Sequence, residues 1–147
     1  QLLEAQRLCE SYCGDVLFQP HIYYLFRDAC VAGNVEVANM LINTDEFDVN
    51  YEMDDYDGDE MMCYTPLYFA SWKGHSEIVK KLLENKSIDV NKKAQMDDSD
   101  RYSPLHIACE KGYSEIVKEL LKNESVDVNG KSEVSDIYNC TMNGPEG

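Results

Sequence analysis

Basic residues are scarce in this chain of 147 residues, which has 13 Lys and Arg against 28 Asp and Glu and a formal net charge of −15. Nucleic acids and anionic membranes would repel such a chain, so neither is expected as its partner. Long apolar runs are also missing, since runs such as Ile22 to Phe26 are far too short to span a bilayer. Because 44% of the residues are nevertheless hydrophobic, the sequence predicts a folded domain and not a disordered chain.

The negative charge is unevenly distributed along the chain. Between Arg27 and Lys73 the sequence has no basic residue but 11 acidic ones. The rest of the chain keeps 17 acidic residues (28 less 11) against 13 basic ones, which is close to balance. The excess negative charge therefore belongs to the segment between Arg27 and Lys73, and it favours a basic protein or peptide as the partner.

Two segments of the sequence are nearly identical at an offset of 38 residues. Residues 74–83 read GHSEIVKKLL and residues 112–121 read GYSEIVKELL, and Asp-Val-Asn follows each of them. Related openings precede them, TPLYFA at 65–70 and SPLHIA at 103–108. A weaker third copy lies 41 positions before the first of these and includes Gly33. Repetition at this period predicts a solenoid of stacked units.

Each unit predicts two antiparallel helices. A hydroxyl residue can cap the first helix, a proline follows at the first helical position, and a glycine can end the helix in the left-handed conformation. The second helix has apolar residues at helical spacing along one stripe. Two such helices cannot bury their apolar stripes alone, so neighbouring units must stack. In the second unit these positions are Thr65, Pro66 and Gly74, and the stripe is Ile78, Val79, Leu82 and Leu83.

These motifs resemble the ankyrin repeat, whose signature is T-P-L-H-x-A followed by two helices. The resemblance implies an all-α fold, an ankyrin-repeat solenoid of stacked helix-turn-helix units joined by β-hairpin fingers. The first copy resembles an N-terminal capping repeat, because Leu25 and Phe26 replace the signature's Pro and Leu. The expected organisation is a capping helix and linker at 1–21, repeats at 22–50, 51–91 and 92–129 within 22–130, and a tail or the start of a truncated fourth repeat at 131–147.

Both fingers are longer than the resemblance implies. About eight residues are expected between the Asn of Asp-Val-Asn and the next opening, whereas Asn50 and Thr65 are 15 positions apart and Asn91 and Ser103 are 12 apart. The first enlarged finger, at 51–62, has six acidic residues and no basic one. It is therefore expected to project from the solenoid as an acidic hairpin.

Cysteines and histidines supply no recognisable reactive site. The six cysteines lack zinc spacing, and Cys30 and Cys109 occupy equivalent packing positions in the first and third repeats. We therefore expect free thiols in a reducing compartment, the cytoplasm or alternatively the nucleus. The resemblance implies a structural hydrogen bond for His106. No motif supports a nucleophilic pair or a cofactor site, so the sequence predicts neither an enzyme nor a bound cofactor.

The acidic finger leaves a calcium site open as an alternative. Asp55, Asp57 and Asp59 alternate, and calcium prefers several carboxylate oxygens. An EF-hand loop starting at Asp55 would need Gly at its sixth position and Glu at its twelfth, where this sequence has Glu60 and Pro66. A second alternative is that the segment is a regulatory or spacer part of a larger multidomain protein. The sequence does not decide between them.

The resemblance implies that a partner docks on the finger tips and first helices, which line the concave face. The chain itself is expected to be a monomer or part of a longer repeat array. Trp72 is expected at a solvent-facing helix position, although packing against Tyr64 or a finger is the alternative. The candidate contacts are aromatic residues, the exposed pairs before the turn glycines and the acids of the first finger: Tyr64, Tyr102, Trp72, Lys73, Glu110, Lys111, Asp54, Asp55, Asp57, Asp59 and Glu60.

Overall fold

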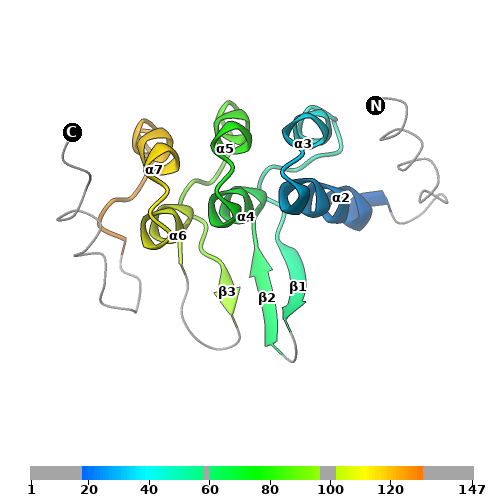
Figure 1. The fold of residues 1–147 in the computed structure, drawn as a ribbon, viewed down its shortest axis with the longest axis horizontal. Helices are drawn as coiled ribbons and strands as arrows, with labels where there is room; N and C mark the ends of the chain where they lie inside the picture. Colours follow the sequence, from blue (N-terminus) through cyan, green and yellow to red (C-terminus); the bar gives the residue numbers. More distant parts are fainter. Residues whose placement is uncertain (1–17, 58–59, 97–101, 131–147) are drawn as a thin grey trace.

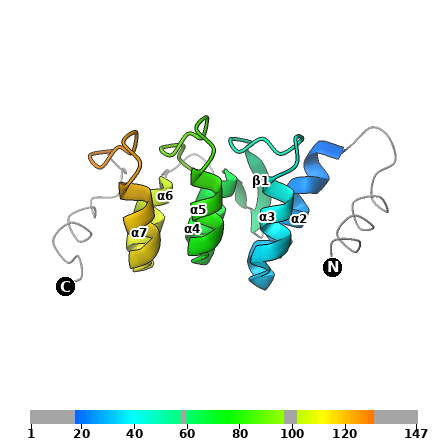
Figure 2. The same cartoon turned by 90° about the horizontal axis from the view of Figure 1, so that it is seen from above.

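Three helix pairs stack side by side in the computed structural model, which describes residues 18–57, 60–96 and 102–130 (Figures 1 and 2). The first helices of the pairs contact one another in an inner row, and the second helices contact one another in an outer row. The predicted solenoid of helix-turn-helix units is confirmed. The pairs are α2 (Phe18–Ala32) with α3 (Val35–Ile42), α4 (Pro66–Lys73) with α5 (Ser76–Leu83), and α6 (Pro104–Glu110) with α7 (Ser114–Leu121).

The fingers form a small antiparallel sheet on one side of the helices (Figure 1). Its strands are β1 (Met53–Asp57), β2 (Glu60–Tyr64) and β3 (Gln95–Met96), in the order β1-β2-β3. The first two strands are the predicted hairpin of the enlarged first finger. The third strand comes from the second finger and pairs with β2, so the two fingers join in one sheet.

The predicted helix boundaries in the second and third repeats are confirmed. The hydroxyl oxygens of Thr65 and Ser103 each accept the backbone N–H three residues later, at 3.3 Å in both repeats. Gly74 and Gly112 have φ values of +82° and +73°, so both turns use the left-handed conformation that favours glycine.

The first helix extends beyond the expected start of the first repeat. Helix α2 has 15 residues and starts at Phe18, so the boundary expected at residue 22 falls inside it. Pro20 lies in its first turn, where a missing backbone N–H costs no intrahelical hydrogen bond. The helix expected within 1–14 and the fourth-repeat opening expected within 131–147 lie outside the described residues.

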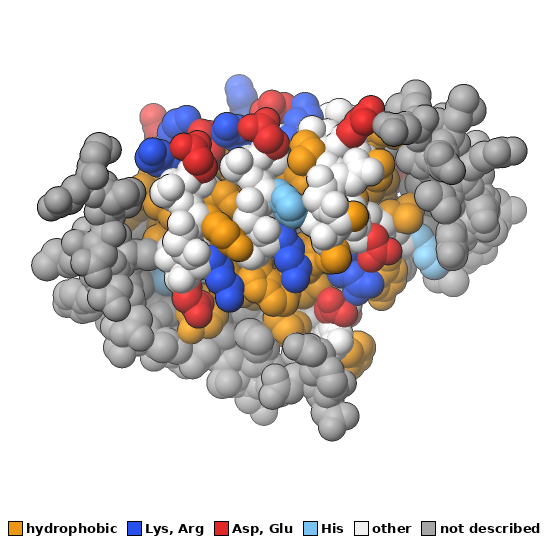
Figure 3. All heavy atoms as spheres, in the orientation of Figure 1, with side chains coloured by type: hydrophobic (Ala, Val, Ile, Leu, Met, Phe, Trp, Pro, Cys, Tyr) orange, Lys and Arg blue, Asp and Glu red, His pale blue; other side chains and the backbone are white. Residues whose placement is uncertain are grey.

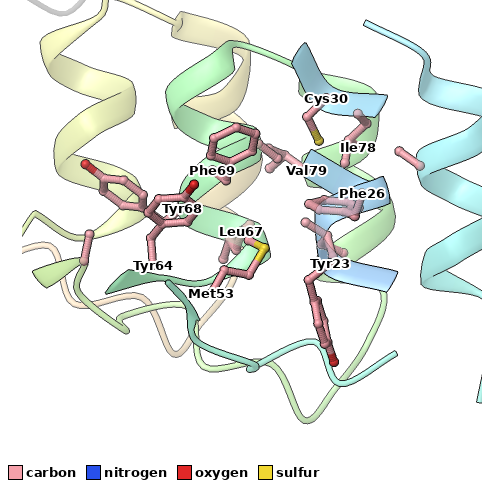
Figure 4. Packing of buried hydrophobic residues seen from close by; sticks show 14 of the residues in the cluster. Tyr23, Phe26, Cys30, Met53, Tyr64, Leu67, Tyr68, Phe69, Ile78 and Val79 are labelled. Atoms are coloured by element: carbon pink, nitrogen blue, oxygen red, sulfur yellow. The ribbon is translucent and has the colours of Figure 1, made fainter. Parts of the chain in front are cut away.

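The apolar stripes of adjacent repeats meet in one continuous core. Figure 4 shows Phe69 of α4 and Val79 of α5 directed toward Phe26 and Cys30 of α2. All four side chains are at most 2% exposed. Stacking therefore buries what one helix pair would leave in water, as the repeat pattern predicts.

Asparagine side chains also join successive repeats. Asn50 Oδ1 accepts the Asp89 backbone N–H at 2.7 Å, and Asn91 Oδ1 accepts the Asp127 backbone N–H at 2.7 Å. In the first repeat the Tyr23 hydroxyl occupies the corresponding place and accepts the Asp48 backbone N–H at 2.8 Å. The recurring Asp-Val-Asn motif thus has a structural role in connecting one repeat to the next.

Candidate partner-binding surface

The inner helices expose one pair of residues in each repeat, immediately before the turn glycine. The side chains of Lys73, Glu110 and Lys111 are exposed, and Val31, the counterpart of Trp72 in the first repeat, is 64% exposed. In the space-filling view, hydrophobic surface lies beside Lys and Arg side chains at the level of these helices (Figure 3). Acidic and basic side chains alternate instead along the edge formed by α5 and α7. The surface of the inner row therefore combines hydrophobic and charged side chains, whereas the edge formed by α5 and α7 is mainly charged.

Trp72 is half-buried and held by neighbouring rings. Its ring meets Phe69 edge-on, with centroids 5.8 Å apart, and also contacts Tyr64 with centroids 6.4 Å apart. Lys73 Nζ lies 4.1 Å from the Trp72 ring centroid, in a cation–π contact. The alternative packing of Trp72 against Tyr64 is therefore observed, and the part of the indole that stays accessible has a fixed orientation.

Tyr64 is not available as an exposed contact, and its prediction as one was wrong. Its side chain is 1% exposed and stacks on Phe69 with centroids 5.1 Å apart. Its hydroxyl donates a hydrogen bond to Asp55 Oδ2 at 2.7 Å. Burial is the main cause that raises the pKa of Tyr64, and this hydrogen bond is the second. The longer finger covers the position that the repeat signature alone would expose. Tyr102, its counterpart, is half-buried and packs against the core.

Asp55 anchors the first finger to α2. Its carboxylate accepts hydrogen bonds from Arg27 Nη1 at 3.1 Å, from the Tyr64 hydroxyl at 2.7 Å and from the Tyr56 backbone N–H at 2.9 Å. Burial alone would raise the pKa of Asp55, but these donors and the Arg27 charge outweigh it and lower the pKa below its usual value. The carboxylate of Asp55 therefore stabilises the finger's position and is less accessible to a partner.

Of the other acids of the finger, the structure describes the side chain of Asp54 but not those of Asp57, Asp59 and Glu60. Asp54 is exposed and accepts a hydrogen bond from Cys63 Sγ at 2.8 Å, which raises the pKa of the Cys63 thiol to about 11. Asp57 and Glu60 are opposite residues of β1 and β2, although their side chains lie outside the description. Asp59 lies outside the described residues. Asp54 is thus the acid of this set whose exposed carboxylate can be placed.

The calcium alternative gains nothing from the described part of the finger. Both carboxylate oxygens of Asp55 already accept hydrogen bonds, from Arg27 and Tyr64. Within residues 18–57, 60–96 and 102–130, no three His, Cys, Asp or Glu side chains lie together in a way that could hold a metal ion. To bind Asp55, a calcium ion would have to displace Arg27 from the Asp55 carboxylate.

The expectation of free thiols is only partly correct. Cys30 and Cys63 are free, and burial raises the pKa of Cys30 to about 12. Cys109 is joined in a disulfide, which corrects the expectation for that residue. The cytoplasmic or nuclear compartment therefore stays a prediction.

No helix in the described ranges combines the length and apolarity that crossing a membrane requires.

Ser103 and His106 form a close Ser–His pair whose role is structural. Ser103 Oγ contacts His106 Nδ1 and also accepts the His106 backbone N–H, which caps α6. The other ring nitrogen of His106 bonds to the Gly130 carbonyl at 2.9 Å, as the resemblance implied for this residue. Ser103 is only 6% exposed. A hydroxyl used in capping and closed off from solvent is poorly placed to act as a nucleophile.

Sequence reasoning missed the most exposed apolar side chains near the acidic finger. Tyr56 is 70% exposed and Met61 is 44% exposed, while Tyr24 on α2 is 45% exposed beneath the Arg27 guanidinium. The alternation of side chains along a strand could have identified Tyr56, because it is one residue from Asp55 and must face the opposite way. The repeat signature gave no such information, since the finger is longer than the signature.

Comparison with known proteins agrees with the geometry. A family model described as ankyrin repeats, in three copies, matches residues 23–94 and 64–132. No match was found among the curated proteins. The two matched ranges overlap and together cover well over half of the sequence, including all three helix pairs except the first five residues of α2. Ankyrin repeats are generally modules for protein–protein interaction. The chain belongs to the ankyrin repeat family.

Proposed function

We propose that the chain binds another protein through the exposed ends of α2, α4 and α6 together with the first finger. The observation that carries this proposal is a contrast between repeats. Their buried stripes are alike, whereas the exposed pair before each turn glycine changes from Val31-Ala32 to Trp72-Lys73 and then to Glu110-Lys111. Packing explains the shared positions, whereas the accessible parts of these pairs change from repeat to repeat, which makes them suitable for recognition.

The chemistry along this surface favours a partner with both apolar and charged groups. The accessible part of Trp72, oriented by its ring contacts, is a suitable anchor, because rigid aromatic side chains often dominate interface energies. Tyr102 is half-buried at the edge of the same region. The acids of the first finger favour a basic partner and would mainly speed and orient association.

The apolar part of the proposal is tested with a partner captured on the immobilised chain, then purified and measured by calorimetry. Because Trp72 also contacts the core, the test pairs Trp72→Ala with Val31→Ser, which changes a 64% exposed side chain. Each is expected to weaken binding, Trp72→Ala by at least about tenfold. Leu121→Ser on α7, with 49% exposure, is the matched control and should leave affinity unchanged. Equal affinity in all variants would refute the proposed surface.

The electrostatic part is tested by neutralising acids of the finger other than the anchoring Asp55. The charge variant combines Asp54→Asn, Asp57→Asn, Asp59→Asn and Glu60→Gln. It is expected to weaken binding and to reduce its dependence on salt, because the Debye length of about 10 Å at 0.1 M screens exposed charges. A control variant neutralises the same number of acids on or just after the outer-row helices, namely Glu36, Glu84, Glu115 and Glu124. A control that lowers affinity as much as the finger variant would show that only net charge matters.

A further inference from the structure

The first finger has two chemically different faces. Residues directly opposite each other in an antiparallel pair share a face, and successive residues alternate between faces. The register pairs Met53 with Tyr64 and Asp55 with Met62 on one face, which we call the inner face. The outer face is defined by the intervening pairs: Asp54 with Cys63, and Tyr56 with Met61.

The inner face fixes the hairpin against the solenoid. Met53, Met62 and Tyr64 are each at most 5% exposed and belong to the core cluster. Asp55 on the same face is bonded to Arg27 of α2. Because the inner face is held by packing and by an ion pair, the outer face is presented in a fixed orientation. A partner would then need to order little of the described hairpin on binding.

The outer face places two exposed apolar side chains next to each other. Tyr56 and Met61 are 70% and 44% exposed and stand directly opposite in the register. Directly opposite residues of an antiparallel pair have Cβ atoms about 4.5–5.5 Å apart, so the two side chains are neighbours. Two large apolar groups in water at this separation form one small patch, and Tyr and Met are both enriched in interfaces.

The patch lies in an acidic segment of the chain. Asp54 is exposed on the same face, and the finger segment 51–62 contains no basic residue. The nearby bases are occupied: Arg27 pairs with Asp55, and Lys92 Nζ lies 3.0 Å from Glu52. A second copy of this chain is a poor occupant, because two acidic fingers would repel each other. A basic group next to an apolar one complements both features of the outer face.

We propose that the outer face of the first finger is a docking site for a basic amphipathic segment of another protein. Tyr56 and Met61 would contact the apolar stripe of the segment, and a flanking Lys or Arg would pair with Asp54. This rests on the proposed function, since it assumes that the chain is an interaction module. It differs in placing the main apolar contact on the finger and not on the inner helices.

The test uses synthetic peptides of fifteen residues and the full chain labelled for NMR. The probe peptide has Leu along one helical stripe and Lys elsewhere. One control peptide replaces every Lys by Glu, and another keeps the probe's composition but scrambles the order so that no stripe remains. We expect the probe to shift the Tyr56 and Met61 amide signals most. The acidic peptide should not bind, and the scrambled one should bind at least about fivefold more weakly.

Variants then separate the patch from its charged surroundings. Tyr56→Ser is expected to weaken probe binding at least about tenfold, and Met61→Ser somewhat less. Both side chains are largely exposed, so circular dichroism and the melting temperature should stay unchanged. Leu121→Ser, with 49% exposure on α7, is the matched control and should bind the probe normally.

Several outcomes would overturn the inference. Largest shifts over Trp72 and Lys73 would refute the finger site while supporting the proposed inner-helix surface. Equal binding by the scrambled peptide, or by Tyr56→Ser, would show that the acids alone attract the probe. Absence of binding by every peptide would contradict the docking site without bearing on capture of a partner by the inner helices, which is measured separately.

Discussion

The second and third repeats show how strongly burial depends on neighbours when sequence is nearly constant. Helices α5 and α7 read SEIVKKLL and SEIVKELL and differ at a single position. Yet Val79 is 0% exposed whereas its counterpart Val117 is half-buried, and Val90 is 2% exposed whereas Val128 is 46% exposed. The same residue type in the same motif is therefore core in one repeat and surface in the other.

The difference follows from position in the stack. Of the described helices, α5 contacts α4 in its own repeat and both α3 and α7 on its flanks, whereas α7 contacts α6 and has a flanking contact only with α5. In solenoids, stability is approximately the sum of terms within each repeat and terms between neighbours. Equivalent substitutions in the two repeats should then separate these terms, because the internal terms are nearly matched.

The largest contrast is expected at the turn glycines. Both have positive φ, where an alanine costs about 1–2 kcal/mol. A Cβ at Gly74 would also lie 2.8 Å from Tyr113 Cζ in the next repeat, whereas a Cβ at Gly112 meets no atom of the described residues within 4 Å. We therefore expect Gly112→Ala to lower the free energy of unfolding by about 1–2 kcal/mol and Gly74→Ala by about 2–4 kcal/mol in urea titrations.

A double-mutant cycle identifies the cause of that contrast. In a Tyr113→Ala background the clash is absent, so Gly74→Ala should cost no more than Gly112→Ala does in the unchanged chain. If Gly74→Ala remains more costly without the Tyr113 ring, the extra cost comes from within the second repeat. That result would contradict the assignment to an inter-repeat contact.

A smaller contrast is expected at the valines of the two Asp-Val-Asn motifs. Val90→Ala should lower the free energy of unfolding by about 2 kcal/mol, because it removes buried methyl groups and leaves a cavity. Val128→Ala should change it by less than about 0.5 kcal/mol, since 46% of that side chain is already exposed. Equal losses would mean that Val128 is covered in solution by a part of the chain outside the described residues.

The same dependence on neighbours explains how far the sequence could predict the fold. Thr65, Pro66 and Gly74 act through local backbone geometry, so their motif predicted where α4 begins and ends. No such opening precedes α2, and its apolar residues alone do not define where the helix begins, which is at Phe18. The internal repeat identified the stacking but not which valine stays exposed.

The candidate site was harder to predict for a related reason. Tyr64 occupies a position that the repeat signature would expose, but the enlarged finger provides Asp55 as a partner for its hydroxyl and buries it. Cross-strand register decides that Asp55 faces inward and Tyr56 outward, and a one-residue shift would reverse both. Composition identified the finger as acidic, but the face that each acid occupies follows only from the strand pairing.

The smallest contrast concerns two buried serines with opposite expected effects. Ser71 is 0% exposed and its hydroxyl has no hydrogen-bond partner among the described residues, whereas the Ser103 hydroxyl caps α6. Ser71→Ala removes an unsatisfied polar group, as Cys30 already does at the same place in the first repeat, and should raise the free energy of unfolding by about 1 kcal/mol. Ser103→Ala should lower it by about 1 kcal/mol through loss of the cap. Thermal and urea unfolding of the two variants measure whether each substitution raises or lowers the free energy of unfolding. A loss of stability in Ser71→Ala would show that the Ser71 hydroxyl is hydrogen-bonded in solution. Hydrogen bonding would then not distinguish these two serines.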